Sequence, residues 1–292
     1  MSVVLVSGAN SGIGRLSALA FARAGHSVAA GARSPGRAAE IARVAAAESL
    51  RLRVVQLDVT QPASVERAVR EAVALFGPVD VLVNNAGVMT AGPVEGAAED
   101  SAHQVFETNF FGPLRLIQAV LPSMRERRGG SIVLVGSLLG RVPAPGASVY
   151  AASKQAAAAL HDALSFEAES FGIRVTSVDI GPYRTGISTI AAPGPVAASA
   201  YAPLLEALRG RQVRRLAESG DPAEVADAVV EAAFSGRPRL HIAVGSHARE
   251  HLDGDDRAER FLRGLRCELG RPEPVFPSNR SDNDRNNDPG PP

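Results

Sequence analysis

Tyr150, Lys154 and Ser137 have residue types and spacings that suit proton transfer in a ligand-binding cleft. Tyr150 and Lys154 are four residues apart, so a helix places both side chains on one face. A tyrosine ordinarily loses its proton at about pH 10, and a neighbouring ammonium stabilises the phenolate. We therefore expect Lys154 to lower the pKa of Tyr150, so that Tyr150 works as a general acid and base. Ser137 follows an apolar strand pattern, and ligands bind at the strand ends of open parallel sheets.

Lys154 is the only lysine among 31 basic residues, and the others are arginines. If codon usage favours arginine, a lysine should remain only at a position where arginine cannot take over its role. Arginine is planar and stays charged, whereas lysine carries a compact ammonium on a flexible stem. Chance survival is the alternative, and the position close to Tyr150 favours a chemical role.

A glycine-rich turn lies between the first strand pattern and the first helix pattern. Glycine lets the backbone adopt positive φ and lets a phosphate approach closely. The helix that follows offers free N–H groups and a positive dipole end to a pyrophosphate. A purely structural turn is the alternative, but doubly wound folds bind dinucleotides at their first βα turn. The predicted phosphate-binding residues are Gly8, Asn10, Ser11, Gly12, Ile13 and Gly14.

The end of the second strand pattern indicates which nucleotide binds. An acidic residue there would hold the ribose 2′-hydroxyl of NAD. This chain has Gly31-Ala32-Arg33-Ser34 instead. Arg33 can form a forked, charge-assisted contact with the 2′-phosphate of NADP. A solvated surface arginine is the alternative, and the missing acid favours NADP(H) over NAD(H) as the cofactor.

Strand and helix patterns alternate along the first 180 residues. Because the strands are continuous apolar runs, both faces of the sheet must be buried. This alternation predicts an α/β fold, a doubly wound parallel sheet of the Rossmann type in a single domain. The expected strands are 2–7, 28–31, 53–57, 79–83, 131–135 and 174–179, and the expected helices are 15–24, 36–47, 64–76, 103–127 and 150–171.

The later part of the chain departs from this alternation of strands and helices. Residues 186–217 are rich in proline and small residues and then in arginine, which predicts a lid over the substrate. A helix at 222–234 and a strand at 240–244 complete a nucleotide-binding domain that spans residues 1–245. A C-terminal extension follows at 246–276, and the polar composition of 277–292 predicts a disordered tail.

Composition excludes several classes of protein. Hydrophobic residues make up 45% of the 292 residues, which is enough for a full core. The 31 basic and 31 acidic residues balance, so we expect no nucleic-acid partner and no membrane partner. The single cysteine, Cys267, excludes an internal disulfide, and we expect a cytoplasmic location. His247 and His251 form an H-x-x-E-H pattern in a charged stretch, which we interpret as a solvated helix face, so we predict no metal site.

The glycine turn, Ser137, Tyr150 and Lys154 follow one another along the chain in an order that resembles the short-chain dehydrogenase/reductase family, in its branch with a T-G-x-x-x-G-I-G turn. The resemblance covers residues 2–245. The turn reads S-G-A-N-S-G-I-G, with Ser7 in place of the usual threonine. Residues 84–87 match the family's N-N-A-G segment, and Asn109 occurs in T-N-F-F-G.

The resemblance implies two sets of site residues. Those that would contact the cofactor, besides the glycine turn and Arg33, are Asp58, Val59, Asn85, Ala86, Gly87, Tyr150, Lys154, Gly181, Pro182 and Thr185. Among the catalytic residues, Asn109 would hold a water near the lysine, and Ser137 would orient and polarise a carbonyl. Tyr150 would transfer the proton, and Lys154 would bind the nicotinamide ribose. Ile180 replaces the proline of the family's P-G-x-x-x-T segment, which affects the expected backbone shape there.

The function that this resemblance implies is an NADP-dependent oxidoreductase that interconverts a secondary alcohol and a ketone or aldehyde. Two alternatives are a ketoreductase acting on 3-oxoacyl or polyketide substrates tethered to a carrier protein, and a non-catalytic NADP-sensing protein. We expect a small-molecule substrate. Relatives form dimers through the helices that correspond to 103–127 and 150–171, so we also expect a homodimer or homotetramer.

Overall fold

The computed structural model describes residues 1–184, 188–189, 200–236, 239–252, 263 and 266. Its main sheet has seven parallel strands in the order β3-β2-β1-β4-β6-β7-β9. The chain order reverses between β1 and β4, which makes the crevice at their carboxyl ends a topological switch point. The predicted doubly wound parallel sheet is therefore confirmed. The strands are β1 (Val3–Val6), β2 (Ser27–Ala32), β3 (Leu52–Gln56), β4 (Val81–Asn84), β6 (Gly130–Val135), β7 (Ile173–Ile180) and β9 (His241–Val244).

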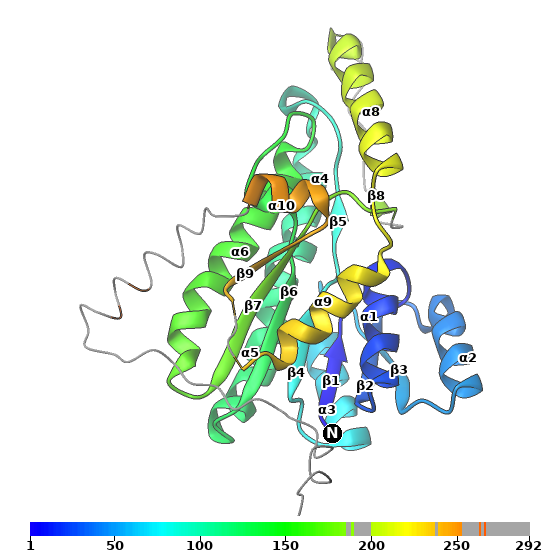
Figure 1. The fold of residues 1–292 in the computed structure, drawn as a ribbon, viewed down its shortest axis with the longest axis vertical. Helices are drawn as coiled ribbons and strands as arrows, with labels where there is room; N and C mark the ends of the chain where they lie inside the picture. The colour runs from blue at the N-terminus through cyan, green and yellow to red at the C-terminus, as the bar shows by residue number, and fades with distance from the viewer. Residues whose placement is uncertain (185–187, 190–199, 237–238, 253–262, 264–265, 267–292) are drawn as a thin grey trace, which may run out of the picture.

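Helices cover both faces of this sheet (Figure 1). One face carries α1 (Gly12–Arg23), α2 (Ala39–Ala47) and α9 (Ala223–Phe234). The other face carries α3 (Pro62–Phe76), α5 (Gly112–Glu126) and α6 (Ser148–Glu169). In the part of the chain that the structure describes, no helix is both long and apolar enough to cross a membrane.

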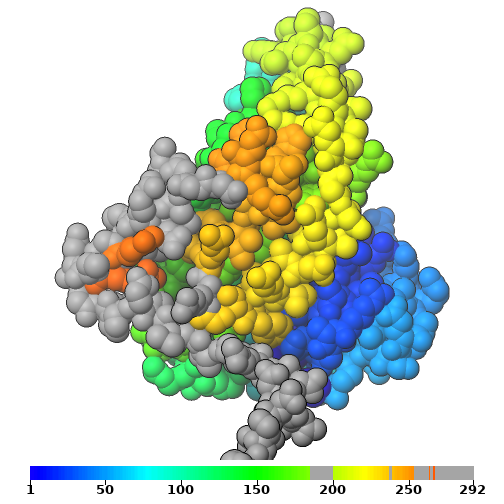
Figure 2. Space-filling view, in the orientation of Figure 1, coloured from blue at the N-terminus to red at the C-terminus, as the bar shows by residue number. Residues whose placement is uncertain are grey.

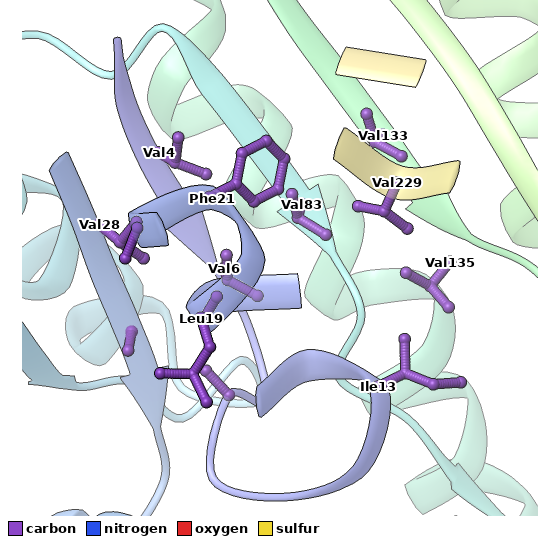
Figure 3. Close-up of a cluster of buried hydrophobic side chains, with 14 of the residues drawn as sticks. Val4, Val6, Ile13, Leu19, Phe21, Val28, Val83, Val133, Val135 and Val229 are labelled. Atoms are coloured by element: carbon purple, nitrogen blue, oxygen red, sulfur yellow. The ribbon is translucent and has the colours of Figure 1, made fainter. Parts of the chain in front are cut away.

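Two apolar clusters hold the layers together. Within β1, Val4 and Val6 belong to the cluster under α1 and α9, while Leu5 belongs to the cluster on the opposite face. Figure 3 shows Phe21 of α1 and Val229 of α9 together with valines of several strands in the first cluster. This double burial is why a central strand such as β1, with the sequence VVLV, is apolar at every position rather than at alternate ones.

The helix expected at 103–127 is longer and is interrupted. It begins as α4 (Glu99–Phe106), passes through one π-helical turn, η3 (Glu107–Phe111), and continues as α5. The π turn places Asn109 against Val88 of the short strand β5 (Val88–Met89), and β5 pairs with β8 (Ser188–Thr189). Such turns carry an extra residue per turn, which the 3.6-residue periodicity of the sequence does not reveal.

The predicted lid region contains α8 (Ala202–Ala217), which projects from the body of the protein (Figure 1) and forms the upper end of its surface (Figure 2). The Tyr201 hydroxyl donates to Glu95 Oε2 at 2.9 Å, which ties the start of α8 to η2 (Val94–Gly96). Leu208 of α8 lies against Gly146, in the loop before α6. The extension begins with α10 (Ser246–Leu252), whereas the predicted tail at 277–292 lies outside the described residues.

Candidate active site

A cleft lies at the carboxyl ends of the strands, at the switch point of the sheet, and holds about 1220 Å³ of space, part of it open to solvent. Predicted residues from five separate parts of the sequence line this cleft together. They are Gly8, Asn10, Ser11, Gly12, Ile13, Gly14, Arg33, Asp58, Val59, Asn85, Ala86, Gly87, Tyr150 and Lys154.

The glycine turn has the backbone shape that a phosphate site needs. Gly8 and Gly12 have φ values of 66° and 53°, in the left-handed region that favours glycine. A Cβ atom at Gly14 would overlap with the Gly8 carbonyl and with Asn85 Nδ2. Ser11 precedes α1 and makes no side-chain capping bond, so its side chain leaves the first N–H groups of the helix to a ligand.

Ser7 joins the glycine turn to the end of β4. Its Oγ accepts hydrogen bonds from Asn85 N at 3.0 Å and Ala86 N at 3.1 Å, and donates to Val83 O at 3.2 Å. In return, Asn85 Nδ2 donates to the carbonyls of Ser7 at 2.9 Å and Gly8 at 3.2 Å. The serine hydroxyl therefore fixes two segments of the cleft wall relative to each other.

Two arginines stand at the end of β2. Arg33 is exposed and lines the cleft, as predicted, and so does Arg37 in the turn η1 (Pro35–Ala38). The sequence analysis missed Arg37. The available signal was a second basic residue four positions after the first, in a segment without an acidic residue.

The loop after β3 supplies Asp58 and Val59. Asp58 Oδ1 accepts hydrogen bonds from the Thr60 backbone N–H at 3.0 Å and the Thr60 hydroxyl at 2.8 Å. Asp58 N donates to Ser64 Oγ at 3.0 Å, at the start of α3. These bonds fix the loop, in which Val59 lies against Gly112.

Asn109 lies behind the cleft rather than on its lining. Its Oδ1 accepts from Val88 N and its Nδ2 donates to Val88 O, both at 2.9 Å. Nδ2 also donates to Ser153 Oγ at 2.9 Å, on α6 next to Lys154. In this structure Asn109 therefore connects β5 to the helix that carries Tyr150 and Lys154.

Tyr150 and Ser137 lie close to each other beside the cleft, and both residues are buried. Ser137 begins the turn η4 (Leu138–Gly140), and its Oγ accepts from Leu139 N at 3.2 Å. Burial raises the pKa of Tyr150, and the nearby Ser137 hydroxyl lowers it by less. The expected lowering of this pKa by Lys154 is therefore wrong for this structure, because the loss of hydration of the phenolate outweighs the stabilising contacts.

Lys154 is buried on the same face of α6, four residues after Tyr150. Its Nζ donates to Val135 O at 2.9 Å, at the end of β6. Burial lowers the pKa of Lys154 to about 8, and the charge of Asp179 opposes that shift. Burial therefore favours the neutral amine of Lys154, and the negative charge of Asp179 favours its ammonium form.

The segment after β7 is described only in part. Ile180 lines the cleft and pairs with Val244 of β9, so the residue that replaces the family's proline extends the strand. Gly181 N donates to Val244 O at 3.2 Å. Gly181 and Pro182 follow directly but are not part of the cleft lining, and Thr185 lies outside the described residues.

These residues fit a dinucleotide cofactor. The glycine turn is a cradle that a Cβ atom at Gly14 would fill, and the N-terminus of α1 opens onto it. The two arginines suit an anionic group on the nucleoside at one end, and Lys154 suits ribose hydroxyl groups at the other. At that second end, Ser137 and Tyr150 can bind and protonate an oxygen atom of a substrate.

Comparison with known proteins agrees with this geometry. The family model described as short chain dehydrogenase matches residues 2–193. The chain is 38% identical over 191 residues to dehydrogenase/reductase SDR family member 7B of Mus musculus, a match that covers 64% of this chain and 59% of the mouse protein. It is 38% identical over 252 residues to retinol dehydrogenase 8 of Bos taurus, covering 81% of this chain and 79% of that protein.

A solved structure extends the similarity to the fold. A short-chain dehydrogenase from Streptomyces avermitilis superimposes with a TM-score of 0.76 at 35% identity, covering 92% of this chain and 95% of that one. The sequence match and the shared architecture lead to one conclusion: this chain belongs to the short-chain dehydrogenase/reductase family.

Proposed function

We propose that this protein is an NADP-dependent oxidoreductase that interconverts a secondary alcohol and a ketone or aldehyde. The observation that carries the proposal is the placement of Tyr150 and Lys154, on one face of α6, in the same cleft as the glycine turn, with Ser137 close to Tyr150. The preference for NADP over NAD rests on the arginines at positions 33 and 37 and on the absence of an acid at the end of β2.

The chain's residues would divide the reaction as follows. Ser137 binds the carbonyl oxygen of the substrate and polarises it, and Tyr150 donates its phenolic proton to that oxygen as negative charge develops there. The nicotinamide, when bound, supplies the hydride. Lys154 would hold the nicotinamide ribose. In the reverse direction, Tyr150 accepts the proton of the alcohol.

The raised pKa of Tyr150 keeps its phenol protonated at neutral pH, in the form that donates a proton to a developing alkoxide.

The lid would set the substrate. Apolar side chains are exposed at Val94, at Val142 and at Leu204 of α8, on elements that adjoin the loop before Tyr150. Exposed apolar groups of this kind suit a lipophilic carbonyl compound. The similarity to a retinol dehydrogenase supports the same class of substrate.

A screen for NADPH oxidation across steroid, retinoid, acyl and aromatic carbonyl compounds tests the proposal. On an accepted ketone, Tyr150→Phe should lower kcat at least about 100-fold, because no phenolic proton remains. Lys154→Arg should lower it to a similar extent, because the wider guanidinium does not fit the buried position beside Val135, and misplacement by about 1 Å costs on the order of 100-fold in rate. Both variants should keep their folded structure and measurable NADPH binding.

The exposed Tyr201 provides the matched control, since Tyr201→Phe also removes a phenolic hydroxyl. Near-wild-type kcat in Tyr150→Phe would contradict the mechanism. NADPH binding without oxidation by any compound in the screen would instead favour a sensing role.

A carrier-bound substrate is the second candidate. Arg209, Arg211 and Arg214 are exposed on α8, and basic groups beside a substrate channel suit an acidic carrier protein. A carrier-linked 3-oxoacyl substrate should then be reduced with a much higher kcat/KM than the same acyl group on a small thiol. Equal values for both substrates would exclude this candidate.

A further inference from the structure

A group of charged side chains lies beneath the cleft, between β7, β9 and α6. His241 Nδ1 is 2.8 Å from Asp179 Oδ2, and its Nε2 is 2.8 Å from Asp162 Oδ1. The side chains of His241 and Asp179 are only 9% and 2% exposed. Ser177 Oγ donates to the other oxygen of Asp179 at 2.8 Å. Every polar atom of the Asp179 carboxylate therefore has a defined partner.

The charges around His241 favour its cationic form. A protonated imidazole has two N–H donors, one for each carboxylate. Burial lowers the pKa of His241, and the hydrogen bonds and charges of Asp162 and Asp179 raise it to about 9. Arg141, after η4, acts in the opposite direction, because its Nη1 lies 2.9 Å from His241 Nε2 and a guanidinium can only donate. Arg141 Nη1 is also 3.8 Å from Asp162 Oδ2, so Asp162 faces both cations, whereas Asp179 faces His241.

His161 adds no charge to this group. It is fully buried on α6, its Nδ1–H donates to Ala157 O at 2.8 Å, and burial lowers its pKa to about 4. On the opposite face of the sheet, α9 packs apolar residues such as Val225 and Val229 against Val178. The groups in contact with Asp179 are therefore His241 and Ser177, and the charge of Asp179 also acts on Lys154.

Asp179 lies directly under the catalytic part of the cleft. A Cβ atom at Gly136 would overlap with Asp179 Oδ1, so the carboxylate adjoins the segment between Val135 and Ser137. Gly136 lines the cleft, and Val135 O accepts the hydrogen bond from Lys154 Nζ at 2.9 Å. The negative charge of Asp179 opposes the deprotonation of Lys154 that burial favours.

We propose that Asp179, fixed by His241 and Ser177, is a positioning residue whose buried negative charge keeps Lys154 in its ammonium form at the cofactor site. The importance of that ammonium for the reaction rests on the proposed function, whereas the electrostatic coupling does not. His241 has a supporting role, because its contact with Asp179 Oδ2 fixes the position of the carboxylate.

The single lysine of the chain makes a direct test simple. In protein labelled with ¹³Cε-lysine, one side-chain resonance reports Lys154, and its chemical shift follows protonation. The wild-type resonance should titrate with a midpoint near pH 8. In Asp179→Asn the midpoint should fall by roughly one pH unit, because an opposite charge in a buried site is lost. An unchanged midpoint would overturn the proposal.

Asp162→Asn is the matched control. It removes the same charge from the same imidazole, but the charge of Asp162 acts on His241 and His161 rather than on Lys154. Its midpoint should stay within about 0.3 pH units of wild type. Equal shifts in both variants would show that the cluster as a whole, and not Asp179, sets the charge of Lys154.

Two further variants keep the test decisive if Asp179→Asn does not fold. The double variant Asp179→Asn/His241→Gln removes the carboxylate and the facing cation together, so neither is left buried without its partner. Its Lys154 midpoint should also lie below that of wild type. His241→Arg retains a cation with several N–H donors and should restore the wild-type midpoint.

Kinetics gives a separate readout. Because Lys154 is charged below its pKa, kcat/KM should fall as the pH rises through about 8, and this alkaline limb should move to lower pH in Asp179→Asn and stay in place in His241→Arg. A shifted resonance in a protein that reduces no carbonyl compound would leave the coupling standing and reject the proposed function. An active enzyme whose Lys154 resonance does not shift in Asp179→Asn would reject the electrostatic coupling and leave the proposed function standing.

Discussion

Arg33 and Arg37 bring two guanidinium groups to the part of the cleft that follows β2. The position of Arg33 follows from the strand end, and Arg37 reaches the same cleft because the turn η1 folds back over it. Only NADPH carries a 2′-phosphate for these groups to contact. Discrimination between the two nicotinamide cofactors should therefore be shared between two residues.

Removing either charge should weaken NADPH binding by roughly tenfold, and the double variant Arg33→Ala/Arg37→Ala should lose most of the preference over NADH. The measurement is the Kd of each cofactor by fluorescence titration. Arg43→Ala is a suitable control, because Arg43 is exposed on α2 and is not part of the cleft lining. Equal losses for NADPH and NADH would contradict the assignment of Arg33 and Arg37.

At the scale of elements, the cleft depends on how β1 and β4 end. Ser7 is almost fully buried, and its hydroxyl is the acceptor for two consecutive N–H groups of the segment after β4. Without this hydroxyl both donors would be left without a partner in a buried place, which costs more than the hydrogen bonds themselves contribute. The connection between the glycine turn and the segment 85–87 would then depend on the bonds from Asn85 Nδ2 to the carbonyls of Ser7 and Gly8.

A comparison of Ser7→Thr with Ser7→Val isolates this hydroxyl, because the two introduced side chains have nearly the same shape. Ser7→Thr should match wild type in stability and NADPH affinity. Ser7→Val should lower the free energy of unfolding by roughly 1–3 kcal/mol and weaken NADPH binding. Chemical denaturation and cofactor titration measure the two effects, and equal behaviour of the two variants would show that the hydroxyl is not needed.

At the scale of the whole molecule, buried histidines make stability depend on pH in both directions. The pKa of His161 is about 4 in the folded protein against an ordinary value of 6.5, so folding requires the neutral form. Stability is therefore lost as the pH falls from about 6.5 to 4. The pKa of His241 is raised to about 9, so its contribution is complete below about 6.5 and is lost as the pH rises through 9.

His161→Gln should abolish the loss of stability that protonation of His161 causes at acidic pH. For wild type, this part of the loss amounts to about 3 kcal/mol between pH 6.5 and 4. The variant is expected to be less stable at pH 7 because of altered packing, but its stability should change less over that range. Urea denaturation at several pH values measures the slope, with exposed His103→Gln as the control. Parallel slopes for wild type and His161→Gln would refute the assignment.

The sequence by itself determined the features that depend on neighbours along the chain. Apolar runs alternating with helix patterns were enough for the doubly wound sheet, because burial on both faces makes central strands such as β1 apolar at consecutive positions. The position of Tyr150 and Lys154 on one face of α6 followed from helical geometry alone. The glycine turn and Arg33 followed from their places at strand ends.

Only the tertiary structure decided the features that depend on residues far apart in the sequence. The bonds of Ser7 with Asn85, the π turn that aims Asn109 at Val88, and the pairing of Asp179 with His241 each join segments that no local pattern connects. The pKa of Tyr150 was predicted in the wrong direction for the same reason. The spacing of residues along the chain indicates which charges lie near Tyr150. The loss of hydration of its phenolate outweighs the effect of those charges, and it depends on how completely the folded chain covers the side chain.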